Sequence, residues 1–338
     1  MKNDFQDYLT TFFTKYITLQ RGFSENSVSS YSDSFIFFFR YCQEAHAIRQ
    51  EKMNFTAMSK NLITGFCEWL EKDRNCSIST RNLRLTALQT FFRYVQAEAP
   101  QHAALCRDIL EIKRKKNTRK APSCLQGIEI KMLLAEPDAH SKEGLRDLAV
   151  LALLYDTGTR ISELINLRVG DVTINTVATV RVIGKGNKMR LVPISPETAN
   201  IITAYLKSNK IDSNNPVQPL FVNRSKMKLT RPGVTYILKK YVDLARAKNP
   251  GYFTIDVTPH IMRHSKATQL LLSGVNLVYI RDFLGHSSVV TTEHYAKTNP
   301  EFMRKAIEKS SPSIDNVTDD YSEEEKQDFT EFLKKFRI

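Results

Sequence analysis

The 338-residue sequence has no apolar run that approaches the roughly 18 residues of a membrane-spanning helix. Its first residues, MKNDFQDYLTTFF, lack the basic and then apolar order of a secretory signal peptide. The five cysteines are odd in number and never form a CxxC pair, which disfavours a disulfide framework and a zinc cage. These absences predict a cytoplasmic protein with reduced thiols.

Acidic side chains are fewer than basic ones, with 36 aspartates and glutamates against 49 lysines and arginines and a formal net charge of +13. The shortage is uneven, because residues 311–338 contain eight acidic and four basic side chains. That segment carries −4, which leaves +17 on the rest of the chain. Such an excess of positive charge predicts a polyanionic partner, of which nucleic acid is the commonest.

The first 112 residues show helical spacing of apolar side chains. In SENSVSSYSDSFIFFFRYC and in STRNLRLTALQTFFRYV, apolar residues recur every three or four positions, and the first stretch begins with serines typical of a helix start. We expect a small helical bundle. Arg81 and Arg84 lie between the apolar positions of the second stretch, so they face either DNA phosphates or solvent.

A run of basic residues follows this bundle. Six of the eight residues from Lys113 to Lys120 are basic, beginning with Lys113, Arg114, Lys115 and Lys116, and a proline comes soon after. A packed element rarely tolerates such a run, so residues 113–125 are expected to form an exposed linker between two domains. The linker either lies along a phosphate backbone or is a soluble connector.

The pattern from residue 126 onward is mixed. The nearly all-apolar helix from Leu148 to Tyr155 is expected at the centre of a core. Residues 178–183 and 189–194 resemble strands around GKGNK, which predicts a hairpin, and the chain is helical again after Thr230. The expected fold class is therefore mainly α with a small antiparallel sheet.

Residues 312–338 form an acidic spacer followed by an amphipathic helix. The helix begins with a capping box at Ser322 and Glu325. Its apolar stripe has helical spacing and consists of Phe329, Phe332, Leu333 and Phe336. This stripe must be buried, either on its own chain or on a neighbouring subunit.

Short motifs spread over the second half contain a set of basic residues and one tyrosine. They are Arg160 in TGTRISEL, Lys185 in GKGNK, His260 and Arg263 in HIMRH, His286 in FLGHSSV, and Tyr295 in TTEHYAKTNP. A tyrosine has a pKa of about 10 and is a poor nucleophile without help. Basic groups that bind an anion, together with a nucleophile, suit phosphoryl transfer by electrostatic stabilisation.

A metal site is disfavoured. His260 and His264 are four residues apart, as in HExxH, but Ile261 stands where that motif has glutamate. No cluster of carboxylates accompanies the two histidines in the sequence. The set is therefore interpreted as metal-free.

Three stretches carry a resemblance to a known family: RDLAVLALLYDTGTRISELINLRVGDV, VRVIGKGNKMRLVPI and VTPHIMRHSKATQLLLSGVNLVYIRDFLGHSSVVTTEHYA. Their amino-acid sequences and their order in the chain resemble the tyrosine recombinase (phage integrase) family, above all its Xer-like members. All six catalytic positions of the family pattern are present in order. The resemblance implies a two-domain, C-shaped DNA clamp, with a helical, SAM-like core-binding domain in residues 1–112 and a catalytic domain in residues 126–311.

The resemblance also implies a mechanism. Tyr295 would attack a phosphodiester, giving a 3′-phosphotyrosyl bond and a free 5′-hydroxyl. Arg160 and Arg263 would hold the non-bridging oxygens, where guanidinium geometry matches the phosphate. Because the ester stores the energy of the broken bond, neither ATP nor a metal cofactor is needed.

The remaining residues of the set have implied supporting roles. Lys185 would protonate the leaving 5′-oxygen as general acid. His260 would assist proton transfer or orient the phosphate, and His286 would hydrogen-bond the phosphate. Glu163, also in TGTRISEL, would support a basic residue of the active site.

The partners implied by the resemblance are duplex DNA with inverted-repeat core sites and three further copies of the chain in a tetramer. The C-terminal stripe would be exchanged between protomers. The implied location is the bacterial cytoplasm, in association with the nucleoid. The N-terminal sequence favours a recombinase of a mobile element over a housekeeping recombinase. Two other functions stay open: a type IB topoisomerase-like strand transferase and a non-catalytic DNA-binding regulator.

Overall fold

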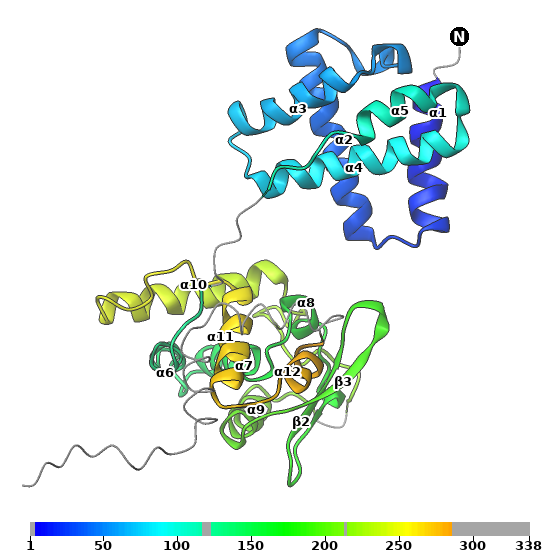
Figure 1. Cartoon of the computed structure of the whole chain (residues 1–338). Helices are drawn as coiled ribbons and strands as arrows, with labels where there is room; N and C mark the ends of the chain where they lie inside the picture. The colour runs from blue at the N-terminus through cyan, green and yellow to red at the C-terminus, as the bar shows by residue number, and fades with distance from the viewer. Residues whose placement is uncertain (1–3, 117–122, 213–214, 286–338) are drawn as a thin grey trace, which may run out of the picture. The chain divides into compact units, whose positions relative to one another are not determined.

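The computed structural model of the chain describes residues 4–116, 123–212 and 215–285. The chain divides into two compact units, Met1–Lys120 and Ala121–Ile338, and each has its own hydrophobic core (Figure 1). The expected fold class is confirmed, because the described elements are mainly helices with one small antiparallel sheet. Among the described residues, no helix is both long and apolar enough to cross a membrane.

The described part of the first unit is helical. Its elements are α1 (Asp4–Thr11), the π-helix η1 (Phe12–Gln20), α2 (Glu25–His46), the short 3-10 helices η2 (Gln50–Lys52) and η3 (Phe55–Ala57), α3 (Lys60–Lys72), α4 (Ile78–Glu98), η4 (Pro100–His102) and α5 (Ala103–Leu110).

Aromatic rings fill the core of this unit. The ring centroid of Phe91 on α4 lies 5.4 Å from that of Phe5, 5.3 Å from that of Phe12 and 5.4 Å from that of Phe35. All three pairs meet edge to face, the arrangement that ring quadrupoles favour. Because these partners come from α1, η1 and α2, Phe91 joins the N-terminal helices to α4.

Arg81 on α4 is buried inside the first unit, although the sequence predicted a position on the surface. It is 5% exposed, its Nε is 3.5 Å from Glu71 Oε1, and its Nη1 donates to the carbonyl of Lys113 at 3.4 Å. The expectation that Arg81 faces phosphates or solvent is therefore wrong. A buried arginine needs such a countercharge, because desolvation of an unpaired guanidinium is costly.

The start of the basic run is tied to the same helix. The Asn82 side chain donates to the carbonyl of Lys115 at 2.8 Å and accepts from its backbone N–H at 3.1 Å. Lys115 Nζ pairs with Glu71 at 2.9 Å. The guanidinium of Arg84 packs 3.8 Å from the ring centroid of Phe37, which lies on α2.

The second unit combines helices with a three-stranded sheet. Its described elements are α6 (Gly127–Ala135), α7 (Lys142–Thr157), α8 (Ile161–Leu164), η5 (Val169–Asp171), β1 (Val172–Thr173), β2 (Thr179–Ile183), η6 (Lys185–Asn187), β3 (Met189–Pro193), α9 (Pro196–Ser208), α10 (Arg231–Lys248), α11 (Pro259–Leu272) and α12 (Leu277–Leu284).

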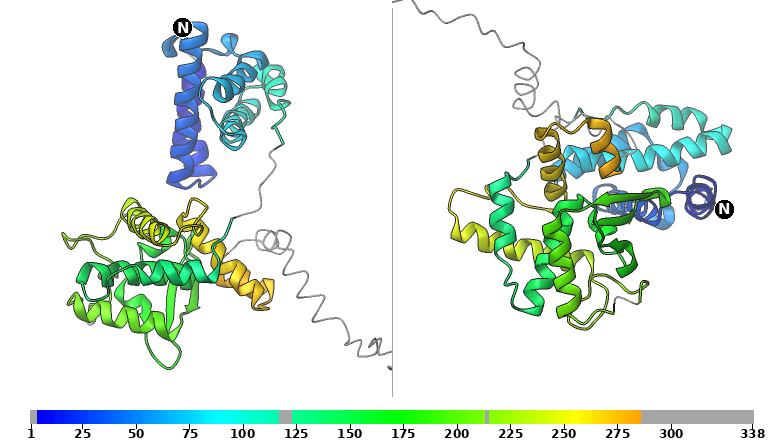
Figure 2. Two further views of the ribbon diagram at one scale, coloured as in Figure 1. Left: turned by 90° about the vertical axis from the view of Figure 1, so that its left-hand side faces the viewer. Right: turned by 90° about the horizontal axis from the view of Figure 1, so that it is seen from below.

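Helix α7 forms the centre of the second core. The apolar run expected there is buried from Ala149 to Leu154. Figure 2 shows α7 crossing the middle of the unit between α9 and α10, and α7 also contacts α11. A helix that is apolar on nearly all sides needs neighbours on all sides, and these helices supply them.

The sheet has the order β1-β2-β3 with antiparallel pairing throughout. In β2 and β3 the register pairs Val180 with Val192 and Val182 with Arg190. Side chains alternate between the two faces of a strand, so Arg190 shares the inner face with buried valines. The turn between the two strands is η6, which contains Lys185.

Helix ends in the second unit follow local rules. Thr230 and Thr258 are the N-caps of α10 and α11. Their hydroxyls accept hydrogen bonds from the backbone N–H groups of Gly233 and Ile261, respectively. Gly158 and Gly285 end α7 and α12 with left-handed backbone, at φ values of 54° and 66°. The ends at Gly158, Thr258 and Gly285 lie in or next to the motifs TGTRISEL, HIMRH and FLGHSSV.

The burial pattern of α4 predicts different costs for two leucines. Leu88 is 0% and Leu83 is 54% exposed. Leu88→Ala should lower the free energy of unfolding by about 2–5 kcal/mol, because it leaves a cavity. Leu83→Ala should change it by less than about 0.5 kcal/mol. Urea unfolding followed by fluorescence of Trp69, the one tryptophan of the chain, measures both; equal losses would contradict this placement of α4.

Candidate active site

Three arginines from distant parts of the second unit converge on the C-terminal end of α12. Arg190 Nε donates to the carbonyl of Phe283 at 2.9 Å, and Arg263 Nη2 donates to that of Leu284 at 2.6 Å. Arg160 Nη2 makes a longer contact of 3.5 Å with the carbonyl of Gly285. The last carbonyls of a helix lack intrahelical partners and form the negative end of its dipole, so they attract cations.

Glu163 connects two of these arginines. Its Oε1 accepts from Arg160 Nη1 at 2.8 Å, and its Oε2 accepts from Arg190 Nη2 at 2.8 Å. The same Oε2 accepts from the backbone N–H of Arg160 at 3.0 Å, because Arg160 is the N-cap of α8 and Glu163 lies in its first turn. The Glu163 side chain is 4% exposed, so these bonds form with little water nearby.

The surroundings of Glu163 keep it ionised. Burial works to raise the pKa of its carboxyl, but the hydrogen bonds from Arg190 and from the backbone and side chain of Arg160, together with the charge of Arg190, outweigh it. The pKa of Glu163 is therefore lowered from its ordinary value. At neutral pH the carboxylate is therefore a countercharge for the guanidinium cluster.

Arg263 holds α11 against the turn that precedes Arg160. It is buried, and its Nη1 donates to the carbonyl of Gly158 at 2.6 Å. A Cβ on Gly158 would lie 2.9 Å from a methyl group of Leu284, so the turn and α12 are in close contact. The hydrogen bond from Arg263 to Gly158 thus joins the motif HIMRH to the motif TGTR.

Two of the other expected catalytic residues lie on described elements, and two fall outside the described residues. His260 is exposed on α11, one turn before Arg263. Lys185 lies in η6, and its backbone follows Gly184, where a Cβ would lie 3.3 Å from Glu163 Oε1 and 3.4 Å from Arg190 Nη1. His286 and Tyr295 fall outside the described residues.

Arg190 is the residue that the sequence interpretation missed. It stands inside GKGNKMRLVPI, five residues after the expected lysine. One signal was available, because strand alternation puts Arg190 on the same face as Val192, and an inward charge requires a partner. The sequence did not indicate that this partner is Glu163.

Gly285 has no room for a side chain. Its φ of +66° is a conformation that favours glycine. A Cβ at this position would lie 2.7 Å from Arg190 Nη1. The glycine before His286 therefore lets Arg190 approach the end of α12.

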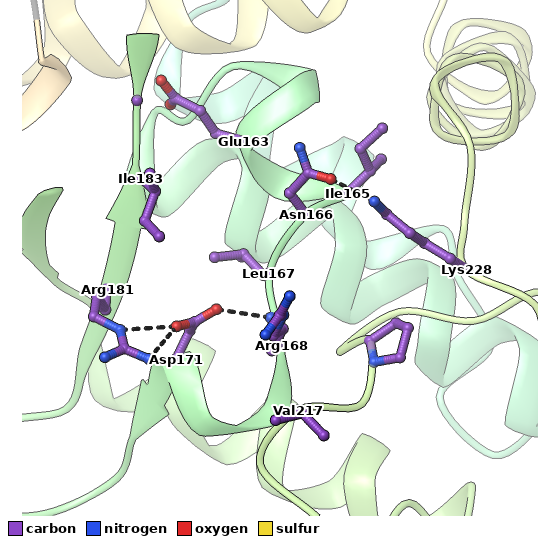
Figure 3. A pocket seen from close by; sticks show the side chains of 12 residues that line it. Glu163, Ile165, Asn166, Leu167, Arg168, Asp171, Arg181, Ile183, Val217 and Lys228 are labelled. Atoms are coloured by element: carbon purple, nitrogen blue, oxygen red, sulfur yellow. Dashed lines mark hydrogen bonds and ion pairs between the residues drawn. The ribbon is translucent and has the colours of Figure 1, made fainter. Parts of the chain in front are cut away.

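A cavity of about 610 Å³ has Glu163 among its lining residues (Figure 3). Its far end holds Asp171, which accepts from Arg181 Nε at 2.8 Å and from the backbone N–H of Arg168 at 2.9 Å. Lys228 Nζ donates a hydrogen bond to Asn166 Oδ1, and both residues line the cavity. In the described part of the chain, no group of three or more histidine, cysteine or acidic residues is placed to hold a metal ion.

Comparison with known proteins identifies the family. Residues 124–301 match the phage integrase family, and residues 9–100 match the phage integrase N-terminal SAM-like domain. The chain belongs to the phage integrase family, as a tyrosine recombinase of the Xer-like type. The family resemblance of the sequence motifs is thereby confirmed.

Similar proteins match along most of their length. The integrase/recombinase y4rC of Sinorhizobium fredii is 35% identical over 304 residues, which cover 90% of this chain and 91% of that protein. The tyrosine recombinase XerD of Lacticaseibacillus casei is 30% identical over 302 residues, covering 89% and 97%. Of the functions that the sequence left open, these relatives favour the recombinase over a topoisomerase or a regulator.

Solved recombinase structures share the fold. The Tn1549 transposon integrase in complex with transposon right end DNA has a TM-score of 0.69 at 17% identity, covering 89% of this chain and 99% of that one. The XerH recombinase bound to palindromic difH substrate has a TM-score of 0.67 at 19% identity, covering 87% and 82%. The three-stranded sheet and helices described here thus belong to the tyrosine recombinase fold.

The countercharge role of Glu163 predicts a pH-dependent loss of stability in Glu163→Gln. At neutral pH the variant should lose about 3 kcal/mol, because a buried guanidinium loses its partner. Since the folded-state pKa is lowered, the carboxylate's contribution is full above the unfolded pKa of about 4.3 and is lost as pH falls through the folded value. The gap between wild type and variant in urea unfolding, followed by circular dichroism, should therefore close at low pH.

A matched control for this experiment is Glu143→Gln. Glu143 also pairs with an arginine, Arg224, but both side chains are at least half exposed. Exposed pairs contribute little to stability, so this variant should unfold like the wild type. A pH-independent gap for Glu163→Gln, or an equal effect in the control, would contradict the proposed countercharge.

Proposed function

We propose that this protein is a site-specific DNA recombinase in which Tyr295 cleaves duplex DNA and forms a 3′-phosphotyrosyl intermediate. One observation carries the proposal: Arg160 and Arg263 meet at the end of α12, at the carbonyls of residues 284 and 285. The sequence continues from that point through His286 to Tyr295. The anion-binding groups therefore gather where the segment of the nucleophile begins.

The guanidinium cluster suits a phosphodiester. Three arginines and one glutamate leave a net positive charge, and Arg160 keeps about a third of its side chain exposed. Guanidinium groups bind phosphate oxygens in a planar fork and act more strongly where water is scarce. Arg160 and Arg263 would stabilise the charge of the pentavalent transition state and lower the pKa of the attacking phenol.

Protons and electrons balance without a cofactor. The Tyr295 phenol gives up its proton to His260 or to solvent as its oxygen bonds to phosphorus. The bond to the 5′-oxygen breaks, and Lys185 supplies the proton to that oxygen. His260 would orient the phosphate or assist the proton transfer, and His286 would hydrogen-bond the phosphate. In the reverse direction a 5′-hydroxyl attacks the phosphotyrosine, so ligation requires neither ATP nor metal.

The domains would divide the work on DNA. Residues 1–112 would bind the core site, residues 113–125 would link, and residues 126–311 would catalyse, with the two domains closing around the duplex. Arg114 and Lys116 are exposed on either side of Lys115, whose backbone is held by Asn82. They are proposed to neutralise phosphates, together with Lys113, Lys115 and Arg84.

Assembly would follow the symmetry of the site. An inverted-repeat core site presents two half-sites, and two such sites hold four protomers. The segment 312–338, whose stripe is Phe329, Phe332, Leu333 and Phe336, is proposed to pass to a neighbouring protomer. The fold shared with the Tn1549 transposon integrase supports a mobile element as the setting, in the bacterial cytoplasm and bound to the nucleoid.

The nucleophile assignment predicts the loss of a covalent adduct. With nicked duplexes from the DNA flanking the gene, in EDTA and without ATP, the wild type should form an SDS-resistant adduct. Tyr295→Phe should form none, because phenylalanine has no oxygen to attack phosphorus. Tyr279→Phe, which changes a 71% exposed tyrosine of α12, should form the adduct normally. An adduct from Tyr295→Phe would remove the proposed mechanism.

The phosphate-binding role predicts a large effect of a conservative change at Arg160. Arg160→Lys keeps the charge but loses the fork that spans Glu163 and the phosphate. Cleavage should slow by about 10²–10³-fold, the usual cost of one transition-state donor, while a gel shift shows near-normal DNA binding. Arg224→Lys, at an exposed ion pair, should cleave at the wild-type rate. Normal cleavage by Arg160→Lys would exclude the role.

A further inference from the structure

Arg190 lies between the hairpin turn and the rest of the site. It is on β3, paired with Val182, and the next rung of the ladder, Ile183 with Met189, leads into the turn. That turn is closed by a hydrogen bond of 2.8 Å from the N–H of Gly184 to the carbonyl of Lys188. The position of the turn is therefore tied to the strand that carries Arg190.

The donors of Arg190 reach two other segments. Nε donates to the carbonyl of Phe283 at 2.9 Å, and Nη2 donates to Glu163 Oε2 at 2.8 Å. Nη1 faces two glycines, since a Cβ would lie 2.7 Å from it at Gly285 and 3.4 Å from it at Gly184. The guanidinium thus lies close to the glycine before Lys185 and to the glycine before His286, and it donates to Glu163, the partner of Arg160.

Arg190 is placed to act through these neighbours. Its side chain is 11% exposed, and two of its three nitrogens donate to protein atoms. A planar guanidinium with bonds in two directions fixes the distance between the groups that it joins. A lysine has one nitrogen and does not span the carboxylate and the helix end in the same way.

We propose that Arg190 is a positioning residue that holds the hairpin turn of Lys185 against the end of α12, so that protonation of the leaving 5′-oxygen depends on it. This inference rests on the proposed function, which assigns the proton to Lys185. Arg190 fixes where Gly184 lies relative to Glu163 and Gly285. Without it, the turn keeps its strand pairing but loses its attachment to the phosphate-binding arginines.

A change of leaving group separates this role from a general structural one. In the normal substrate the 5′-oxygen takes a proton as the bond to phosphorus breaks. When sulfur replaces that oxygen, the leaving thiol has a pKa of about 8.5 and departs as a thiolate without a proton. A defect in proton delivery is therefore rescued by sulfur, and a defect in phosphate binding or folding is not.

The test compares full-length Arg190→Gln with wild type on duplexes with oxygen or sulfur at the mapped cleavage position, by single-turnover adduct formation. The oxygen substrate should be cleaved at least about 10²-fold more slowly, the scale of general acid catalysis. The sulfur substrate should be cleaved within about fivefold of the wild-type rate. Equal slowing on both substrates, or no slowing on either, would overturn the inference.

Arg181→Gln is the matched control on the same hairpin. Arg181 pairs with Asp171 at 2.8 Å but lies on the outer face of β2 and is half exposed. This variant should cleave both substrates at wild-type rates. If Arg190→Gln does not fold, Arg190→Lys replaces it with the same criterion, because the lysine keeps a charge for Glu163 and loses the bond to Phe283.

Lys185→Ala separates failure of the inference from failure of the proposed function. If sulfur rescues Lys185→Ala but not Arg190→Gln, Lys185 is the acid and the positioning role of Arg190 is rejected. If sulfur rescues neither variant, the assignment of Lys185 fails and the inference fails with it. Rescue of both variants supports the inference.

Discussion

The described part of the candidate active site depends on the unpaired carbonyls at the end of α12. A helix end leaves its last carbonyls without intrahelical partners and concentrates a partial negative charge. Arg160, Arg190 and Arg263 come from three separate segments and meet there because each guanidinium satisfies one carbonyl. The same contacts gather three positive charges at one helix end.

Glu163 makes such a cluster of like charges stable. Guanidinium groups repel one another, and the repulsion grows where water is excluded. A buried carboxylate with two arginine partners offsets part of this repulsion and fixes their geometry. Since one negative charge faces three positive ones, the site keeps a net attraction for an anion.

The excess of basic residues in the first unit has two physical uses. Arg81 is buried against Glu71 and the linker backbone, so its charge contributes to the position of the linker. Arg114 and Lys116 are exposed on the same short stretch. A charge run therefore contains anchored as well as solvent-facing members, and net charge alone does not separate them.

Local patterns in the sequence determined the helices, the hairpin and the motifs with Arg160, Glu163 and Arg263, because periodicity, capping and turn chemistry act over a few residues. Alternation along β3 also placed Arg190 on the inner face. Only the tertiary structure decided that Arg190 meets Glu163 and Phe283, that Gly285 must leave room for it, and that Arg81 is buried. Arg190 and Phe283 are 93 positions apart, and such pairings depend on how the whole core packs, which no local pattern specifies.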